Sequence, residues 1–259
     1  MRTPDEFCVA GIECFFFGER DDRTRPLVFA LHGVGGNATG MFGYCRQLRE
    51  DGLNVIALDH RNHGRRYVDA RHNSCKPELL ALLAGVARDI GLLLDFLPIR
   101  AQLEPNAVGM LGTSMGGCAT LLTMMLEPRI AVGVAMVASG EFEFLFQKPG
   151  ATSTQPECPA DLSAVRKILA RYDPIRAPAT FADRPLLLLN GEEDPTVPVD
   201  SARRFAEAAA PHYTMPERFR FKTFPGVGHE ITDTIWTDAR AWLKRWLLDT
   251  TAAPSWRLE

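Results

Sequence analysis

The feature that most constrains the fold of this chain is a glycine-flanked serine, in the run Gly112-Thr113-Ser114-Met115-Gly116-Gly117. It fits the pattern G-x-S-x-G and stands between a short apolar run, residues 107–111, and a helix-like stretch that ends before Pro128. The motif predicts a buried strand that turns sharply into a helix, with Ser114 in strained backbone geometry and its hydroxyl exposed. Glycines two positions to either side keep Cβ atoms from colliding where strand and helix meet. An ordinary glycine-rich turn is the alternative.

The chain also offers the two further residues that a reactive serine requires. A hydroxyl is a poor nucleophile at neutral pH, so it needs a base within hydrogen-bond reach and a carboxylate that orients the base. Asp194 lies in a polar loop directly after the apolar run 186–189, and His229 lies in a glycine-flanked loop directly after the strand-like run 219–224. We therefore predict that Ser114 is the nucleophile, His229 the base and Asp194 the orienting acid.

The acid and the base each have an alternative. Glu192 and Glu193 are rivals for the acid, and Asp194 could be a solvated turn residue, but the spacing G-x-x-D with Val197 and Pro198 after it favours Asp194. The alternative for His229 is a surface histidine in a turn.

Strand-like runs alternate with helix-like stretches along most of the chain. This alternation implies an α/β fold with a mostly parallel sheet and helices on both faces, in which ligands bind at the carboxyl ends of the strands. Ser114, Asp194 and His229 each stand just past such an end. The predicted strands cover residues 14–17, 27–31, 55–58, 108–111, 132–137, 186–189 and 219–224, and the predicted helices cover residues 78–96, 115–126, 201–210 and 232–248.

One segment, residues 139–180, interrupts this alternation. It begins with a cluster of aromatic residues that includes Phe142, Phe144 and Phe146, and it continues through a stretch rich in proline, serine and threonine to a helix-like run, residues 161–172. We interpret it as a small cap over the site, with the three phenylalanines lining the substrate pocket. A loop that merely covers an edge of the fold is the alternative.

Composition excludes several classes of function. With 259 residues, 46% of them hydrophobic, the chain can bury one large core, so residues 1–259 are expected to form a single domain. A net charge of -3 gives no basic field for nucleic acid, and no apolar run is long enough to cross a membrane. The start lacks the apolar core of a secretion signal, and the six cysteines are scattered. We therefore expect reduced thiols and a cytoplasmic protein.

Four motifs together resemble those of the α/β-hydrolases, closest to the small esterase-like members related to dienelactone hydrolases and prolyl-oligopeptidase catalytic domains. They are Leu31-His32-Gly33-Val34-Gly35-Gly36, the Ser114 motif, residues 191–198, and Gly226-Val227-Gly228-His229-Glu230. The resemblance implies an α/β-hydrolase fold with the chain order serine, acid, histidine, and neither a metal nor an organic cofactor. Dienelactone hydrolases have a cysteine at the position of Ser114, so their substrates cannot be carried over.

An oxyanion hole needs two backbone N–H groups aimed at the developing negative oxygen. Met115, at the predicted start of the helix, should supply one. The resemblance implies Val34 as the second donor. A phosphate-binding loop is the alternative for residues 32–36, but they lack the spacing and the Lys-Ser/Thr pair of a P-loop.

A histidine- and arginine-rich stretch, residues 59–66, follows the run 55–58. It resembles the D-x-R-x-x-G turn of the same fold, where these residues are structural. The functional alternative is a metal site of His60, His63 and His72. The spacing lacks an H-E-x-x-H pattern and an acid in register, so we predict no metal site here. Arg65 and Arg66 could bind an anionic substrate, although solvated loop arginines are the simpler interpretation.

These features together predict a serine hydrolase, most simply a carboxylesterase that cleaves small to medium acyl esters through an acyl-enzyme. Its expected partner is a small-molecule ester, with no role for nucleic acid or membrane. A peptidase of the prolyl-oligopeptidase type, a thioesterase or a lactonase would use the same three residues. A binding protein without catalytic activity on the same scaffold is the alternative from a different class.

Overall fold

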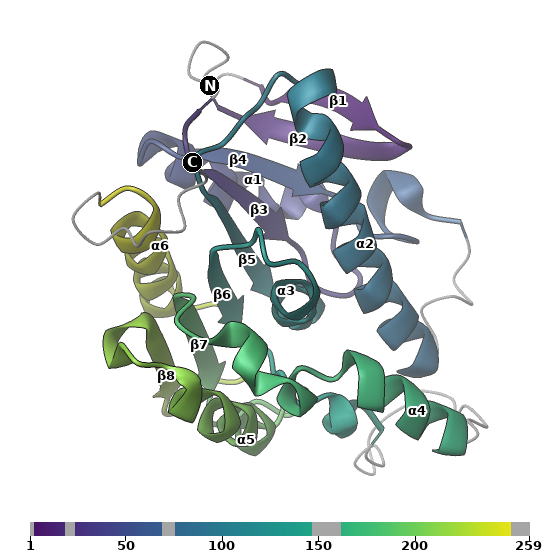
Figure 1. The fold of residues 1–259 in the computed structure, drawn as a ribbon, viewed down its shortest axis with the longest axis vertical. Coiled ribbons are helices and arrows are strands. Elements are labelled where there is room, and N and C mark those ends of the chain that lie inside the picture. The colour runs from purple at the N-terminus through teal and green to yellow at the C-terminus, as the bar shows by residue number, and fades with distance from the viewer. Residues whose placement is uncertain (1–2, 19–23, 69–75, 147–161, 250–259) are drawn as a thin grey trace.

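The computed structural model describes residues 3–18, 24–68, 76–146 and 162–249, which contain an eight-stranded sheet (Figure 1). The strands are β1 (Asp5–Val9), β2 (Ile12–Phe17), β3 (Leu27–Leu31), β4 (Asn54–Leu58), β5 (Val108–Thr113), β6 (Val132–Met136), β7 (Leu186–Gly191) and β8 (Phe219–Phe224). They lie in the order β1-β2-β4-β3-β5-β6-β7-β8. The pairs β1 with β2 and β2 with β4 are antiparallel, and the pairs from β4 through β8 are parallel.

Helices cover both faces of this sheet, as the sequence predicts. The α-helices are α1 (Phe42–Glu50), α2 (Lys76–Arg100), α3 (Met115–Leu126), α4 (Leu162–Tyr172), α5 (Val199–Ala209) and α6 (Asp233–Leu247). The 3-10 helices are η1 (Ala38–Met41), η2 (Gly64–Arg66), η4 (Phe142–Phe146), η5 (Pro174–Arg176), η6 (Pro178–Phe181), η7 (Ala210–His212) and η8 (Pro216–Arg218). Within the described ranges, no helix is long and apolar enough to cross a membrane.

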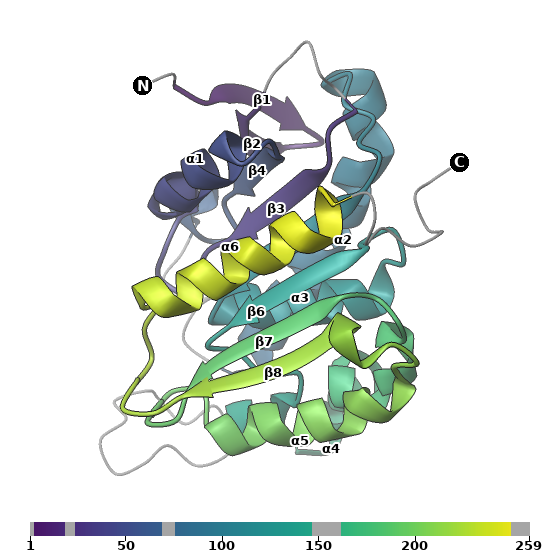
Figure 2. The ribbon, with the colours of Figure 1, turned by 90° about the vertical axis from the view of Figure 1, so that its left-hand side faces the viewer.

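The core lies in two layers, one on each side of the sheet. Helices α2, α3 and α5 lie on one face of the sheet, and α1 and α6 lie on the other (Figure 2). Their buried side chains form the two core layers. Successive strand residues alternate between the layers: Phe29 and Leu31 face the first, and Val28 and Ala30 face the second. Because both faces are covered, all five residues of β3 are buried, which explains why the central strands are continuous apolar runs.

Sequence periodicity fails to predict two of these elements. β1 is an edge strand in which half-buried and exposed residues alternate up to the buried Val9. It joins β2 through Ala10 and Gly11, which have φ angles of 50° and 78°. In α1 only Cys45 and Leu48 are fully buried, so its apolar pattern is weak. One predicted strand, residues 132–137, is a residue too long, because Val137 adopts a φ of 45°, which ends the extended conformation at Met136.

The two ends of the segment 139–180 are joined at its base. Ile175 donates from its backbone N–H to the Gly140 carbonyl at 2.8 Å, and Phe142 donates from its N–H to the carboxylate of Asp173 at 2.8 Å. The carboxylate of Glu141 forms a bidentate ion pair with the α5 guanidinium of Arg204. This base therefore packs against the sheet and α5, while residues 147–161 lie outside the described ranges.

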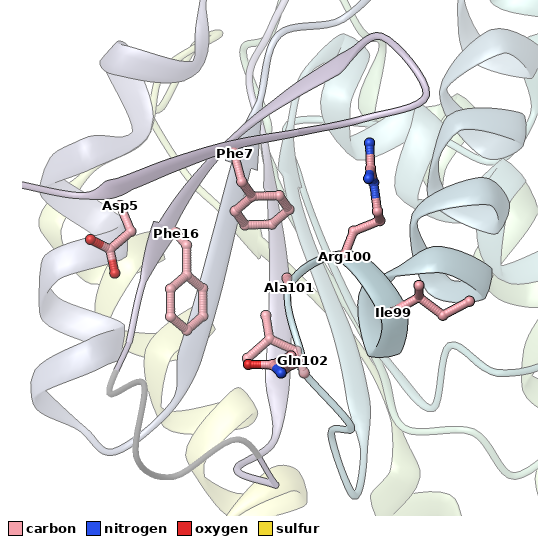
Figure 3. A pocket seen from close by; sticks show the side chains of 8 residues that line it. Asp5, Phe7, Phe16, Ile99, Arg100, Ala101 and Gln102 are labelled. Atoms are coloured by element: carbon pink, nitrogen blue, oxygen red, sulfur yellow. The ribbon is translucent and has the colours of Figure 1, made fainter.

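A cleft of about 360 Å³ opens between β1 and the end of α2 (Figure 3). The rings of Phe7 and Phe16 and the turn from Ala101 to Leu103 form its wall. Since this turn precedes β5, the cleft lies at the amino end of that strand, whereas Ser114 follows its carboxyl end. The cleft is therefore separate from the site described below.

Candidate active site

Ser114 occupies the sharp turn between β5 and α3 that the G-x-S-x-G pattern predicts. Its φ and ψ angles are 54° and -119°, a conformation that L-residues other than glycine rarely adopt. Two backbone hydrogen bonds hold it there: Ser114 N–H donates to the Met136 carbonyl at 2.9 Å, and Cys118 N–H donates to the Ser114 carbonyl at 2.9 Å. Strain of this kind persists only where the surroundings enforce it, and it is concentrated at functional sites.

The flanking glycines are required by close backbone contacts. A Cβ atom on Gly112 would lie 2.1 Å from the carbonyl oxygen of Gly116, so β5 and α3 could not approach as they do. A Cβ atom on Gly116 would lie 2.4 Å from the carbonyl oxygen of Leu31 at the end of β3. The sequence pattern therefore lets the turn that carries Ser114 pack tightly against the neighbouring strand.

The structure brings together the three residues predicted as nucleophile, base and acid. His229 Nε2 lies 2.8 Å from Ser114 Oγ, and His229 Nδ1 lies 2.7 Å from Asp194 Oδ2. The aspartate side chain is fully buried, and its Oδ1 accepts hydrogen bonds from the backbone of Thr196 and Val197 at 2.8 and 2.9 Å. Because a carboxylate only accepts, the imidazole proton belongs on Nδ1, which leaves Nε2 free to accept the hydroxyl proton.

The rival acids in the same loop point elsewhere. Glu192 is exposed, and its Oε1 accepts a hydrogen bond from the Thr223 hydroxyl at 2.6 Å. Glu193 is also exposed, and its backbone N–H donates to the Val227 carbonyl at 3.0 Å. Of the three acids, Asp194 is the one whose carboxylate contacts His229.

The glycine-rich loop after β3 passes directly beside the serine. A Cβ atom on Gly33 would lie 3.4 Å from Ser114 Cβ and 3.9 Å from its Oγ. Residues 33–36 form a turn in which Gly36 N–H donates to the Gly33 carbonyl at 3.1 Å and Gly35 has a φ of 72°. Val34, at the tip of this turn, is 57% exposed, whereas Met115 is buried at the first residue of α3.

The three phenylalanines assigned to the substrate pocket differ in their exposure. Phe142 is fully buried in the core layer that contains α2, α3 and α5, and Phe144 is nearly so. Phe146 is half-buried against the same layer, at the end of η4. Contact with substrate remains a prediction for all three, and Phe146 is the one with the most surface available.

The histidine-rich stretch after β4 packs against the loop after β3. His60 and His63 both lie beside His32, with ring centroids 4.1 and 5.2 Å from it, a contact that sequence reasoning missed. The third histidine of the alternative metal site, His72, lies outside the described residues. No group of three or more metal-binding side chains is found within the part of the chain that the structure describes.

The two arginines weighed as anion ligands are paired with carboxylates. Arg65 contacts Glu6 at 2.7 Å, and its guanidinium lies over the Phe15 ring. Arg66 contacts the buried carboxylate of Asp89 at 2.6 Å. Arg65 is about half exposed, as expected for a solvated loop arginine, whereas the Arg66 side chain is only 17% exposed, so that interpretation is wrong for Arg66. The two ion pairs tie this loop to β1 and α2.

A mostly parallel sheet that carries a strained serine, a histidine and an acid after its strands β5, β8 and β7 defines an α/β-hydrolase. The chain belongs to the prolyl oligopeptidase family, whose sequence profile matches residues 84–250. The profile of the serine aminopeptidase S33 family also matches, over residues 22–142.

Individual proteins are similar to this chain over most of its length. The esterase-named protein YitV of Bacillus subtilis is 24% identical over 92% of this chain and 97% of its own length. The esterase YjfP of Escherichia coli is 29% identical over 82% of this chain and 85% of its own. The crystal structure of TT1662 from Thermus thermophilus superposes with a TM-score of 0.76, at 21% identity, over 96% of this chain and 99% of that one. The chain is thus a serine hydrolase of the esterase or peptidase type.

Proposed function

We propose that this protein is a carboxylesterase that hydrolyses small to medium acyl esters through an acyl-enzyme. The observation that carries the proposal is the continuous hydrogen-bonded path from Ser114 through His229 to the buried carboxylate of Asp194, with separations of 2.8 and 2.7 Å. Such a path supplies a nucleophile, a base and an orienting acid without rearrangement.

In the proposed reaction, Ser114 Oγ attacks the ester carbonyl while His229 Nε2 accepts the hydroxyl proton. Asp194 holds the imidazole in the correct tautomer and stabilises the imidazolium. The negative oxygen of the tetrahedral intermediate would accept hydrogen bonds from the N–H groups of Met115 and Val34, and one such donor is worth about 10²–10³ in kcat. The C–O bond then breaks, and the imidazolium protonates the departing alcohol.

Deacylation repeats these steps with water. His229 removes a proton from the water as it attacks the acyl-enzyme. The second intermediate then collapses, the bond from Ser114 Oγ to the acyl carbon breaks, and the imidazolium returns the proton to Oγ, which releases the acid and free Ser114. No metal or organic cofactor takes part. The segment 139–180 would act as a cap within a single domain, with Phe144 and Phe146 beside the acyl group.

The second candidate function is a peptidase, which both family profiles favour because both families are named for peptidases. A peptidase would use the same three residues on an amide. Thioesters and lactones are also open to the same chemistry. The two esterase-named relatives match 92% and 82% of this chain and favour the ester.

A matched substrate panel tests the proposal. Purified protein should cleave p-nitrophenyl esters from acetate to octanoate with higher kcat/KM than acyl-CoA thioesters or peptide anilides, and Ser114→Ala should remove the activity. Preference for the anilides would replace the ester proposal with the peptidase. Ester cleavage that survives in Ser114→Ala would contradict the assigned nucleophile.

We also propose a cytoplasmic location, which three of the four described cysteines support. Cys14, Cys45 and Cys118 are free and buried, and burial raises the pKa of each thiol to about 12. Thiols in this state are unreactive and consistent with a reducing compartment.

A further inference from the structure

Two buried histidines connect the loop after β4 to the loop that carries Val34. His60, which is fully buried, donates from its backbone N–H to His32 Nε2 at 3.1 Å. Its own ring nitrogen Nε2 lies 3.1 Å from the His32 carbonyl oxygen. The two residues, 28 positions apart, are therefore joined by a reciprocal pair of hydrogen bonds. Neither side chain takes part in the proposed chemistry.

These partners determine the tautomer of each ring. A backbone N–H can only donate, so His32 Nε2 must be an acceptor and the proton of a neutral ring must lie on Nδ1. That Nδ1 lies 2.7 Å from the Gly33 carbonyl oxygen, to which it donates. A carbonyl can only accept, so His60 carries its proton on Nε2. Burial lowers the pKa of His32 to about 4 and that of His60 well below its ordinary value, so both rings stay neutral.

The series of hydrogen bonds from His60 through His32 ends on the peptide group that joins Gly33 to Val34. The Gly33 carbonyl accepts from His32 Nδ1 and from the N–H of Gly36, at 2.7 and 3.1 Å. In a trans peptide the carbonyl and the amide N–H point in opposite directions within one plane. Two donors that fix the Gly33 carbonyl therefore also fix the direction of the Val34 N–H.

This peptide group lies beside the nucleophile, since a Cβ on Gly33 would be 3.4 Å from Ser114 Cβ. An error of about 1 Å in the position of a group in an active site can cost about 10²-fold in rate. A loop rich in glycine has little intrinsic rigidity. An external support is therefore needed if the Val34 N–H is to be aimed before the substrate arrives.

We propose that His60 and His32 are positioning residues that hold the Val34 N–H in the geometry of the oxyanion hole. This inference rests on the proposed function for its catalytic meaning. His60 holds the His32 backbone and ring, and His32 holds the Gly33 carbonyl. His60 and His32 thus serve as a support between the two loops.

The kinetic test compares two replacements of His60. His60→Phe keeps a ring of similar size but loses the Nε2 donor, whereas His60→Gln places an amide N–H at a similar reach. For His60→Phe we expect kcat to fall about tenfold to thirtyfold, less than the 10²–10³ for deletion of an oxyanion donor, with KM within about twofold. The glutamine variant should recover most of the loss. A trifluoromethyl ketone forms an adduct that carries an oxyanion. In His60→Phe its Ki should rise by the same factor by which kcat/KM falls.

His63→Asn is the matched control. His63 belongs to the same buried cluster, but its Nδ1 contacts the Arg61 carbonyl at 3.0 Å within its own loop, and an asparagine amide can replace that donor. Its kcat should stay within about twofold of wild type. If His60→Phe does not fold, His32→Asn is the second variant, because it keeps a donor near Nδ1 and loses the acceptor at Nε2. A folded variant of either position with wild-type kcat and ketone affinity would overturn the proposal.

A measurement by NMR separates this proposal from the proposed function. In isotope-labelled protein, His32 should show the Nδ1–H tautomer and His60 the Nε2–H tautomer. The Val34 amide resonance should shift in His60→Phe and not in His63→Asn. If the wild type cleaves no ester while these signals behave as stated, the proposed function fails and the positioning of Val34 stands. The opposite tautomer on His32, or an unmoved Val34 amide, overturns the positioning itself.

Discussion

Gly191 and Val227 lie in such close contact that a Cβ atom at position 191 would come within 2.2 Å of the Val227 carbonyl oxygen. The same carbonyl accepts a hydrogen bond from the N–H of Glu193 at 3.0 Å. This contact packs the loop that carries Asp194 against the loop that carries His229. The distance between acid and base therefore depends on a glycine that touches neither of them.

Gly191→Ala should separate these loops. We expect a loss of about 1–3 kcal/mol in the free energy of unfolding, as for other overpacked sites, together with a fall in kcat of at least tenfold. Gly43→Ala is the control, because a Cβ atom on Gly43 in α1 would meet none of the described neighbouring atoms within 4 Å, and alanine favours a helix. For each variant, urea unfolding measures the free energy of unfolding, and ester kinetics measures kcat. Wild-type kcat in Gly191→Ala would show that the loop contact does not set the acid–base distance.

The orienting acid is tested by three amide variants. Asp194→Asn should keep the fold but lower kcat by roughly up to 10⁴-fold, because the amide favours the wrong imidazole tautomer. Glu192→Gln and Glu193→Gln should be close to neutral, since neither carboxylate contacts His229. Steady-state kinetics on one ester suffices. If Glu193→Gln proves the damaging change, the acid has been assigned to the wrong residue.

Asp173 should make stability depend on pH. Burial raises the pKa of its carboxyl from the ordinary 3.8 to about 6, so its contribution to stability is fully present below pH 3.8 and is lost as the pH rises through 6. Asp173→Asn removes the charge and keeps an acceptor for the Phe142 N–H. At pH 7.5 we expect the variant to be more stable by on the order of 2–3 kcal/mol, with the difference shrinking toward pH 4. Urea unfolding at several pH values measures it; a pH-independent difference would contradict this pKa.

The aromatic residues of η4 should influence acyl-chain preference. Phe142→Ala should mainly cost stability, about 3–5 kcal/mol, because that side chain is fully buried. Phe146→Ala should instead shift the preferred ester length, with changes of about 1–3 kcal/mol per methylene in kcat/KM. A p-nitrophenyl ester series measures the shift. An unchanged profile in folded Phe142, Phe144 and Phe146 variants would show that η4 does not form the acyl pocket.

Much of the fold could be predicted from the sequence because buried parallel strands leave a strong local signal. The runs that became β3, β5 and β7 are apolar through most of their length, and each is followed by a glycine-containing loop or turn. β1 left no such signal, since an edge strand is partly solvated and its pairing depends on β2. α1 could not be predicted for a similar reason, because only a few of its residues are buried.

Some features of the candidate site could likewise be predicted from the sequence, and others could not. The loops of Ser114, Asp194 and His229 could be placed because each directly follows a strand, and parallel strands share one carboxyl edge. The contact of His32 with His60 could not be predicted, because it joins two loops through ring nitrogens whose orientation no local pattern records. The burial of Phe142 was equally hidden, since an aromatic cluster can line a pocket or fill a core.

Covalent labelling of Ser114 tests the central claim most directly. A fluorophosphonate should react with the folded protein one to one, and mass spectrometry should find the adduct on the peptide that contains Ser114. Ser114→Ala should abolish labelling, and His229→Ala should slow it severely, because the residues of a triad act as a unit. A wild-type protein that does not react, or a Ser114→Ala variant that reacts as fast as the wild type, would contradict the account.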